Sequence, residues 1–207
     1  APTTAPGEKA VNYRHMEVIK YLASVRDDIP KEDIQRLRNS QICPAEAGPK
    51  GLEPTQGTAR LYRVSELFEP KDSLRELALP IIQWPGPPGS YRTSSVEGRF
   101  LALLGLRTHP SVPELLDMMA SADDNLRKRS MYYFISNHHI NGYAAFDLHQ
   151  SNKAFLPIQG TDRLVSPSQC FTNERCSVLG FSILKKELSI HANVRPSLLQ
   201  SYSFLTC

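Results

Sequence analysis

The sequence contains no apolar run long enough to cross a membrane as a helix. Its longest apolar stretches, such as FLALLGL at 100–106, fall far short of the ~18–20 residues that a membrane-spanning helix needs. The first residues, APTTAPGEKA, lack the basic and then apolar segments of a secretion signal, and the chain does not begin with Met. We therefore expect no membrane partner, and we suspect a piece of a longer protein.

Cysteine is scarce, and acceptor sites for N-glycosylation are absent. Cys43, Cys170, Cys176 and Cys207 have neither the density of a disulfide-stapled secreted domain nor the Cys-x-x-Cys spacing of zinc and redox sites. No Asn-x-Ser/Thr sequence occurs. The sequence thus predicts small buried thiols in a reducing compartment, the cytoplasm or the nucleus.

The chain also lacks a strong excess of charge of one sign. Its net charge is +3, and the basic stretches LRKR at 126–129 and LKK at 184–186 are short and interrupted by acidic residues nearby. Hydrophobic residues at 41% and charged residues at 22% are close to ordinary globular usage, which argues against disorder. These features favour a solvated helix face, so nucleic acid is not the expected partner, although a weak nucleic-acid-binding module stays an alternative.

Complete catalytic signatures are missing as well. The chain contains no Gly-x-Ser-x-Gly, no phosphate loop of the Gly-x-x-x-x-Gly-Lys-Ser/Thr type and no His-Glu-x-x-His. His138, His139 and His149, with Asp147 nearby, leave open a metal-dependent hydrolase or nuclease. Adjacent residues of a helix or a strand point in different directions, however, so His138 and His139 do not readily share one ion. We expect these histidines near a helix end, and we expect no catalytic residue, no metal and no cofactor in this segment.

What the chain does contain is one phrase that occurs twice. QGTARLYRVSELF at 56–68 and QGTDRLVSPSQCF at 159–171 agree at seven of thirteen positions without a gap. Upstream of each copy come an apolar helical stretch, Ala-Ser, an Asp-Asp pair, a second helical stretch and a proline-containing tripeptide, ICP at 42–44 and FLP at 155–157. The shared order predicts an internal duplication.

Apolar residues at helical spacing predict two helices in the first unit. The first helix has a stripe of Val18, Ile19, Leu22 and Val25. The second runs from about Pro30 to Asn39 and directs Ile34 and Leu37 inward. The tripeptide that follows suits a short strand, because proline excludes helix there.

The second unit shows the same pattern with a clearer start. Ser111 and Glu114 have the spacing of a capping box with Pro113 in the first turn, and the stripe consists of Val112, Leu115, Leu116 and Met119. The next helix runs from about Asn125 to Asn137 with an inward face of Leu126, Tyr133 and Phe134.

The fold class that follows is α+β and helix-rich, with two repeated units of two helices followed by short strands and a small helical turn. We expect a flexible N-terminal segment at 1–10, a first repeat unit at 11–111, a second at 112–200 and a tail at 201–207. QWPGPPGS at 83–90 is too rich in Pro and Gly for a helix or a central strand and predicts a surface loop.

Local stereochemistry explains most of the repeated phrase. Its glycine, Gly57 or Gly160, suits a turn with positive φ, and its serine can cap a short helical turn. We expect its leucine and phenylalanine to be buried at equivalent places in the two units, namely Leu61, Leu164, Phe68 and Phe171. The two arginines, Arg60 and Arg163, are possible contacts to a partner, because arginine is frequent in interfaces.

The stretches KYLASVRDDIPKEDIQRLRNSQICPAE, LLGLRTHPSVPELL, YFISNHHINGYAAFD and FLPIQGTDRLVSPSQCFTNERCSVLGF resemble a family of very large, uncharacterised fungal proteins. In that family a domain of unknown function follows an ATPase domain of the histidine-kinase and gyrase type (GHKL), and the repeated phrase is also similar to segments of sacsin and the plant NO VEIN proteins. The resemblance covers most of 11–197. It implies a non-catalytic scaffold, or a segment that binds a client protein or the ATPase domain of its own chain.

The hallmarks of that ATPase, Glu-x-x-x-Asn-x-x-Asp and Asp-x-Gly-x-Gly, are missing from this chain, so no nucleotide-binding residue is carried over. The tail LLQSYSFLTC does not match the family pattern. The resemblance therefore places this chain beyond the ATPase domain of a parent protein.

Overall fold

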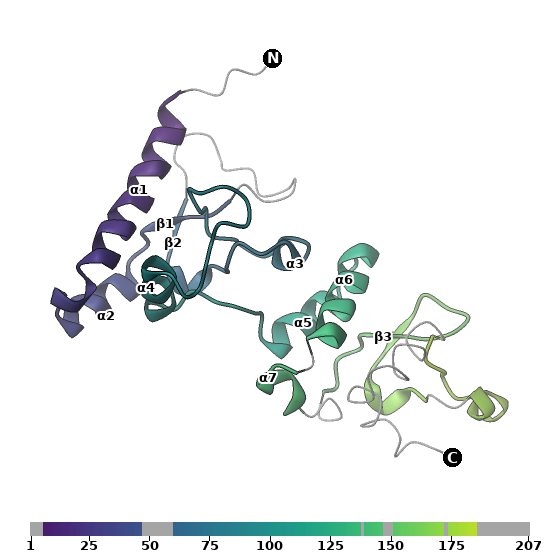
Figure 1. Cartoon of the computed structure of the whole chain (residues 1–207). Coiled ribbons are helices and arrows are strands. Elements are labelled where there is room, and N and C mark those ends of the chain that lie inside the picture. Colours follow the sequence, from purple (N-terminus) through teal and green to yellow (C-terminus); the bar gives the residue numbers. More distant parts are fainter. Residues whose placement is uncertain (1–5, 47–59, 138, 147–150, 172–173, 186–207) are drawn as a thin grey trace. The chain divides into compact units, whose positions relative to one another are not determined.

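A computed structural model describes residues 6–46, 60–137, 139–146, 151–171 and 174–185 (Figure 1). The chain divides into two compact units, Ala1–His109 and Pro110–Cys207, which we call unit 1 and unit 2. Helices and two small two-stranded antiparallel sheets make up the fold, so the predicted α+β class is confirmed. None of the helices in the described parts of the chain has the length and hydropathy to span a membrane.

Unit 1 begins with two α-helices and ends with α4. Its elements are α1 (Pro6–Ser24), η1 (Arg26–Asp28), α2 (Lys31–Asn39), β1 (Cys43–Pro44), β2 (Leu61–Tyr62), η2 (Val64–Glu66), α3 (Asp72–Arg75) and α4 (Val96–Leu104). The last helix ends at Gly105, whose φ of +100° is a left-handed conformation that favours glycine. Residues 83–90 form bends and turns, as their Pro and Gly content predicts.

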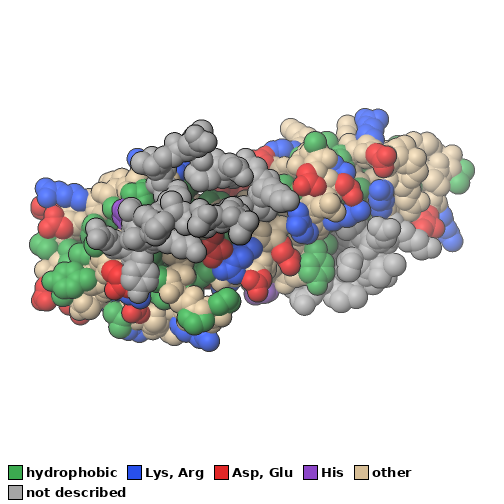
Figure 2. Space-filling model, turned by 90° about the horizontal axis from the view of Figure 1, so that it is seen from above, with side chains coloured by type: hydrophobic (Ala, Val, Ile, Leu, Met, Phe, Trp, Pro, Cys, Tyr) green, Lys and Arg blue, Asp and Glu red, His purple; other side chains and the backbone are tan. Residues whose placement is uncertain are grey.

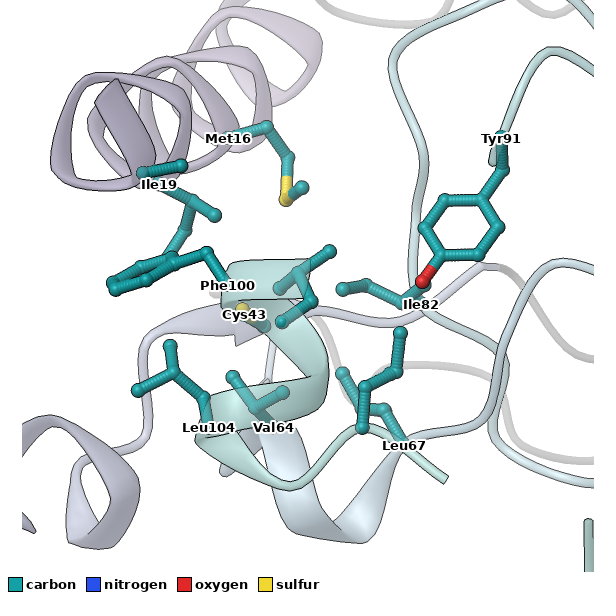
Figure 3. Close-up of a cluster of buried hydrophobic side chains, with 12 residues drawn as sticks. Met16, Ile19, Cys43, Val64, Leu67, Ile82, Tyr91, Phe100 and Leu104 are labelled. Atoms are coloured by element: carbon teal, nitrogen blue, oxygen red, sulfur yellow. The ribbon is translucent and has the colours of Figure 1, made fainter. Parts of the chain in front are cut away.

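The core of unit 1 lies between α1, α4 and the residues around the first sheet (Figure 3). Met16 and Ile19 of α1 face Phe100 and Leu104 of α4, with Cys43 of β1 nearby, and all five are buried. Of the stripe predicted for the first helix, Ile19 is buried and Leu22 and Val25 are half-buried.

The prediction for Val18 was wrong, because 56% of its surface is exposed. Met16, Ile19 and Ala23 form the buried face instead, and their spacing of three and then four residues places them on one side of the helix. Apolar spacing alone could not decide between these two faces, which overlap at Ile19. The position of α4 decided it.

Unit 2 contains three α-helices, two short strands and two 3-10 helices in its described part. They are α5 (Val112–Met119), α6 (Asp124–Ser136), α7 (Asn141–Ala144), β3 (Leu156–Pro157), β4 (Leu164–Val165), η4 (Pro167–Gln169) and η5 (Glu174–Leu179). The capping box at the start of α5 is confirmed, since both the main-chain nitrogen and the hydroxyl of Ser111 lie 2.7 Å from Glu114 Oε2. The whole predicted stripe of α5 is buried, and Tyr133 and Phe134 of α6 are buried with it, while Leu126 is half-buried.

The two sheets have the same register. Pro44 pairs with Leu61 in unit 1, and Pro157 pairs with Leu164 in unit 2. A short 3-10 turn follows each second strand, and the phenylalanine after it pairs with a later segment, Phe68 with Ile81 and Phe171 with Ile183. Phe68 N donates to Pro80 O over 2.9 Å, and Phe171 N donates to Ser182 O over the same distance. We call this strand–strand–turn–strand unit the hairpin module.

Burial of the repeated phrase differs from the prediction. Phe68 is buried, but Leu61, Leu164 and Phe171 are only half-buried. Phe68 packs in the interior with the Arg107 guanidinium 4.3 Å from its ring centroid. The Phe171 ring instead lies 4.6 Å from the ring of Phe181, which is itself 45% exposed.

The serines of the phrase do not cap the turns. Ser65 and Ser168 lie inside η2 and η4, and the N-cap residues are Arg63 and Ser166. The positive φ predicted for the glycine is confirmed at Gly160, at +77°, whereas Gly57 lies outside the described residues.

Candidate functional site

Unit 2 contains a cleft of about 420 Å³ between α6 and the hairpin module. Apolar side chains line its floor: Met119 of α5, Met131 of α6 and Phe155 next to β3 are all buried. Pro157 and Leu164, which pair with each other in the sheet, form the opposite wall. Clefts of this size with apolar floors are typical ligand sites.

Helix α6 supplies one whole side of the cleft because its lining residues share one face. Asp124 is followed on this face by Arg127, Lys128, Met131, Tyr132 and Ile135, which come three, four, seven, eight and eleven residues later. The start of the helix is fixed by the side chain of Asp123, which accepts hydrogen bonds from Asn125 N at 2.9 Å and Leu126 N at 3.3 Å.

Charged groups form the rim. Asp124 accepts from two cations of α6, with Arg127 Nη2 at 2.8 Å and Lys128 Nζ at 2.6 Å. These bonds, that of Lys128 first, hold the pKa of Asp124 below its usual value. Lys185 lies across the cleft, where its main-chain nitrogen donates to Pro157 O over 3.1 Å, and Asp162 lies at the turn of the hairpin.

Tyr132 stands at the edge of the same cleft with 65% of its surface exposed. An exposed aromatic ring beside an apolar floor is a common feature of interfaces. Elsewhere on the surface charge is mixed, and the face shown in Figure 2 has Lys and Arg side chains beside Asp and Glu side chains.

None of the predicted site residues that the structure describes lines this cleft. His139 is exposed, whereas His138, Asp147 and His149 fall outside the described residues. Within the described ranges no group of three or more potential metal ligands occurs. The metal-dependent alternative therefore stays a prediction, because three of its four residues lie outside the described ranges.

Arg60 and Arg163 are both exposed, at equivalent positions of the two hairpin modules. The Arg60 guanidinium lies 4.9 Å from the ring centroid of Tyr62. Arg163 follows Asp162 of the cleft rim, and its main-chain nitrogen donates to Thr161 Oγ1 over 3.3 Å. Both side chains are accessible to a partner.

The prediction of buried thiols is confirmed for three cysteines. Cys43, Cys170 and Cys176 form no disulfide and are buried, and Cys207 lies outside the described residues. Burial raises the pKa of Cys43 to about 12 and that of Cys170 to about 11. Thiols of this kind are poor nucleophiles at neutral pH.

Sequence reasoning missed the cleft. It interpreted LRKR at 126–129 as a solvated face, whereas Arg127 and Lys128 form part of the rim. Ser182 and Lys185 have the Ser-x-x-Lys spacing of some nucleophilic sites, but they lie in an extended segment, where residues three apart point to opposite faces. A weak signal for the cleft was present in the sequence, because Met119 and Met131 are apolar residues on either side of the charged stretch 123–129.

Comparison with protein families identifies a family that this chain matches. The family described as "Protein of unknown function (DUF3684)" matches residues 3–196. The comparisons with curated proteins and with solved structures give no match. Since the family match spans nearly the whole chain, this chain belongs to the DUF3684 family of proteins of unknown function.

Proposed function

We propose that this chain is a non-catalytic, protein-binding segment of a larger chaperone-like protein with a GHKL ATPase domain. The observation that carries the binding role is the cleft of unit 2, with its buried apolar floor and charged rim. The ATPase parent rests on the resemblance of the sequence. The partner is either a client protein or the ATPase domain of the same parent.

The composition of the floor suits binding of varied protein segments. Two of its buried residues, Met119 and Met131, have flexible and polarisable side chains that adapt to ligands of different shape. The rim residues Lys128 and Tyr132 are 71% and 65% exposed, so a partner can reach them without rearrangement of the core.

The hairpin module supports a second part of the proposal, an internal duplication. The same strand register and the same hydrogen bonds after the 3-10 turn occur in both units. Arg60 and Arg163 then present one guanidinium per unit at equivalent places, which suits a partner with two acidic sites. The reduced cysteines fit a location in the cytoplasm or the nucleus.

The test uses a permanently unfolded model client, reduced and carboxymethylated α-lactalbumin, with hydrogen exchange of the whole chain as the readout. We expect the client to slow exchange in α6 and the β3–β4 segment. Tyr132→Ala should weaken client binding, whereas Tyr21→Ala, a tyrosine of similar exposure in unit 1, should not. Binding with no protection of the cleft, or no binding at all, would contradict the proposal.

A further inference from the structure

The cleft of unit 2 has features that define the chemistry of its occupant. Its floor is apolar and consists of three buried side chains, those of Met119, Met131 and Phe155. A polar side chain placed on this floor would lose its water without gaining a hydrogen bond. The floor therefore selects a large aliphatic or aromatic side chain.

Cationic side chains outnumber carboxylates on the rim. Three cations, Arg127, Lys128 and Lys185, line the cleft with two carboxylates, Asp124 and Asp162. Asp124 is already bonded to Arg127 and Lys128. Among the described residues no ion pair involves Lys185, so this ammonium is available to a ligand on the wall opposite α6.

The two cations of α6 that line the cleft differ in how firmly they are held. Arg127 donates to Ser121 O at 2.8 Å as well as to Asp124, and its side chain is 23% exposed. Lys128 is 71% exposed, and such an exposed ion pair contributes little to stability. A ligand carboxylate can therefore replace Asp124 as the partner of Lys128, with Arg127 staying in place.

From these features we propose that the occupant is a short acidic peptide segment of a partner protein, in which a leucine or phenylalanine is flanked by acidic residues. The apolar side chain of the peptide enters the cleft and contacts its floor, and the flanking carboxylates pair with Lys185 on one wall and Lys128 on the other. This inference rests on the proposed function, since it names the partner chemistry of the same cleft.

The experiment measures fluorescence anisotropy of the whole chain with three labelled peptides. The first is Gly-Ser-Glu-Leu-Phe-Asp-Gly-Ser, the second has lysine in place of Glu and Asp, and the third has serine in place of Leu and Phe. We expect saturable binding of the first peptide and at least about tenfold weaker binding of the other two, because each loses one of the two recognition elements.

Variants of the rim test the assignment of the walls. Lys185→Glu should weaken the acidic peptide about tenfold and strengthen the lysine peptide, and the more exposed Lys128→Glu should act in the same direction with less risk to folding. Lys31→Glu, at an exposed lysine in unit 1, is the matched control and should change neither affinity.

The outcomes separate this inference from the proposed function. Equal affinity for all three peptides, or preference for the lysine peptide, would overturn the acidic partner and leave the client-binding result standing. Absence of peptide binding combined with protection of the cleft by the unfolded client would also overturn the inference alone. Absence of both would overturn the two proposals together.

Discussion

Phe68 and Phe171 occupy equivalent positions of the repeated phrase but have different surroundings. Phe68 lies in the interior of unit 1 and forms bridges to both Ile81 and Arg107. Phe171 is half-buried and contacts an exposed ring, that of Phe181. The same residue at the same place of a hairpin module thus contributes differently to stability, because the packing around the module differs.

Phe68→Ala should lower the free energy of unfolding of unit 1 by about 3–5 kcal/mol, the usual cost of removing a buried aromatic ring. Urea denaturation followed by tryptophan fluorescence measures this, since Trp84 lies in unit 1. Val18→Ala, at a 56% exposed position, is the control and should stay within about 0.5 kcal/mol. Similar effects of both variants would show that the inside and outside of unit 1 are wrongly assigned.

Tyr91 is a buried residue with an unsatisfied group. Its hydroxyl forms no hydrogen bond to any residue that the structure describes, and nearby the buried carboxylate of Glu69 accepts from Thr93 Oγ1 over 3.0 Å. Lys71 Nζ lies 2.6 Å from Glu69 Oε2, which is an ion-pair distance, although the geometry is not that of a hydrogen bond. Burial, and then the negative charge of Glu69, raise the pKa of the Tyr91 phenol.

Tyr91→Phe should therefore raise the free energy of unfolding at neutral pH by about 1 kcal/mol, because it removes a buried hydroxyl without a partner. The pKa shift adds a dependence on pH. Above a pH of about 10 the phenol ionises in the unfolded chain but stays neutral in the native chain, because its native pKa is raised. The free energy of unfolding of the wild-type chain therefore falls as the pH rises above that value. The Tyr91→Phe variant should lack this loss.

Urea denaturation at neutral pH and at pH values above about 10 checks both effects. Tyr21→Phe, at a 67% exposed tyrosine, should change neither. A marked loss of stability in Tyr91→Phe at neutral pH would mean that the hydroxyl has a partner after all.

The buried thiols give a prediction at the same scale. Cys43 and Cys170, with pKa values raised by burial to about 12 and about 11, should react with a thiol reagent in denaturant and stay unlabelled in the native chain over the same time. Mass spectrometry of each labelled peptide reads the two sites separately. Fast labelling of either one in the native chain would contradict its burial.

At the scale of elements, α6 decides whether the cleft exists. One face of this helix carries six lining residues, and its first turn is held by the N-cap that Asp123 provides. Ser130 is buried on the same helix and donates to Leu126 O over 2.8 Å. The N-cap thus defines where the helix begins, and the buried residues define which face packs inward. Together they place Arg127 and Lys128 on the rim of the cleft.

Asp123→Ala should cost about 1 kcal/mol in the free energy of unfolding of unit 2, the typical loss for an N-cap. Because unit 2 lacks tryptophan, urea denaturation followed by circular dichroism is the measurement. Asn152→Ala, at an exposed position outside the helices, should have no measurable effect. An equally small effect of both variants would show that the cap does not hold α6.

At the scale of the whole chain, two compact units share a hairpin module but surround it with different helices. In unit 1, α4 packs against α1 and α2, and β1 packs against α1. In unit 2, α5 and α6 pack against each other, and the cleft lies between α6 and the hairpin. The helices that pack around the repeated module therefore differ between the two units.

The isolated chain should neither bind nor hydrolyse Mg-ATP. Phosphoryl transfer needs a glycine-rich cradle, groups that hold Mg²⁺ and a positioned base, and the glycines of this sequence occur in no phosphate-loop pattern. Calorimetric titration of the chain with Mg-ATP should give no saturable heat. Saturable binding in the micromolar range would overturn the non-catalytic proposal.

The sequence by itself determined the local structure of this protein. Helical spacing and the Ser111 capping box located α5. Pro44 and Pro157 excluded helix and favoured short strands, and the repeated phrase predicted matching turns. These features depend on neighbouring residues, so they can be read along the chain. Burial within the phrase could not be read in this way, as Phe171 shows.

Only the tertiary structure decided which faces are covered and where the cleft lies. Val18 and Ile19 are adjacent and both apolar, and the position of α4 determined that Ile19 is buried and Val18 exposed. The cleft likewise brings Arg127 and Lys128 opposite Lys185, more than fifty residues later in the chain. Such pairs meet through packing between elements, which leaves no periodic signal in the sequence.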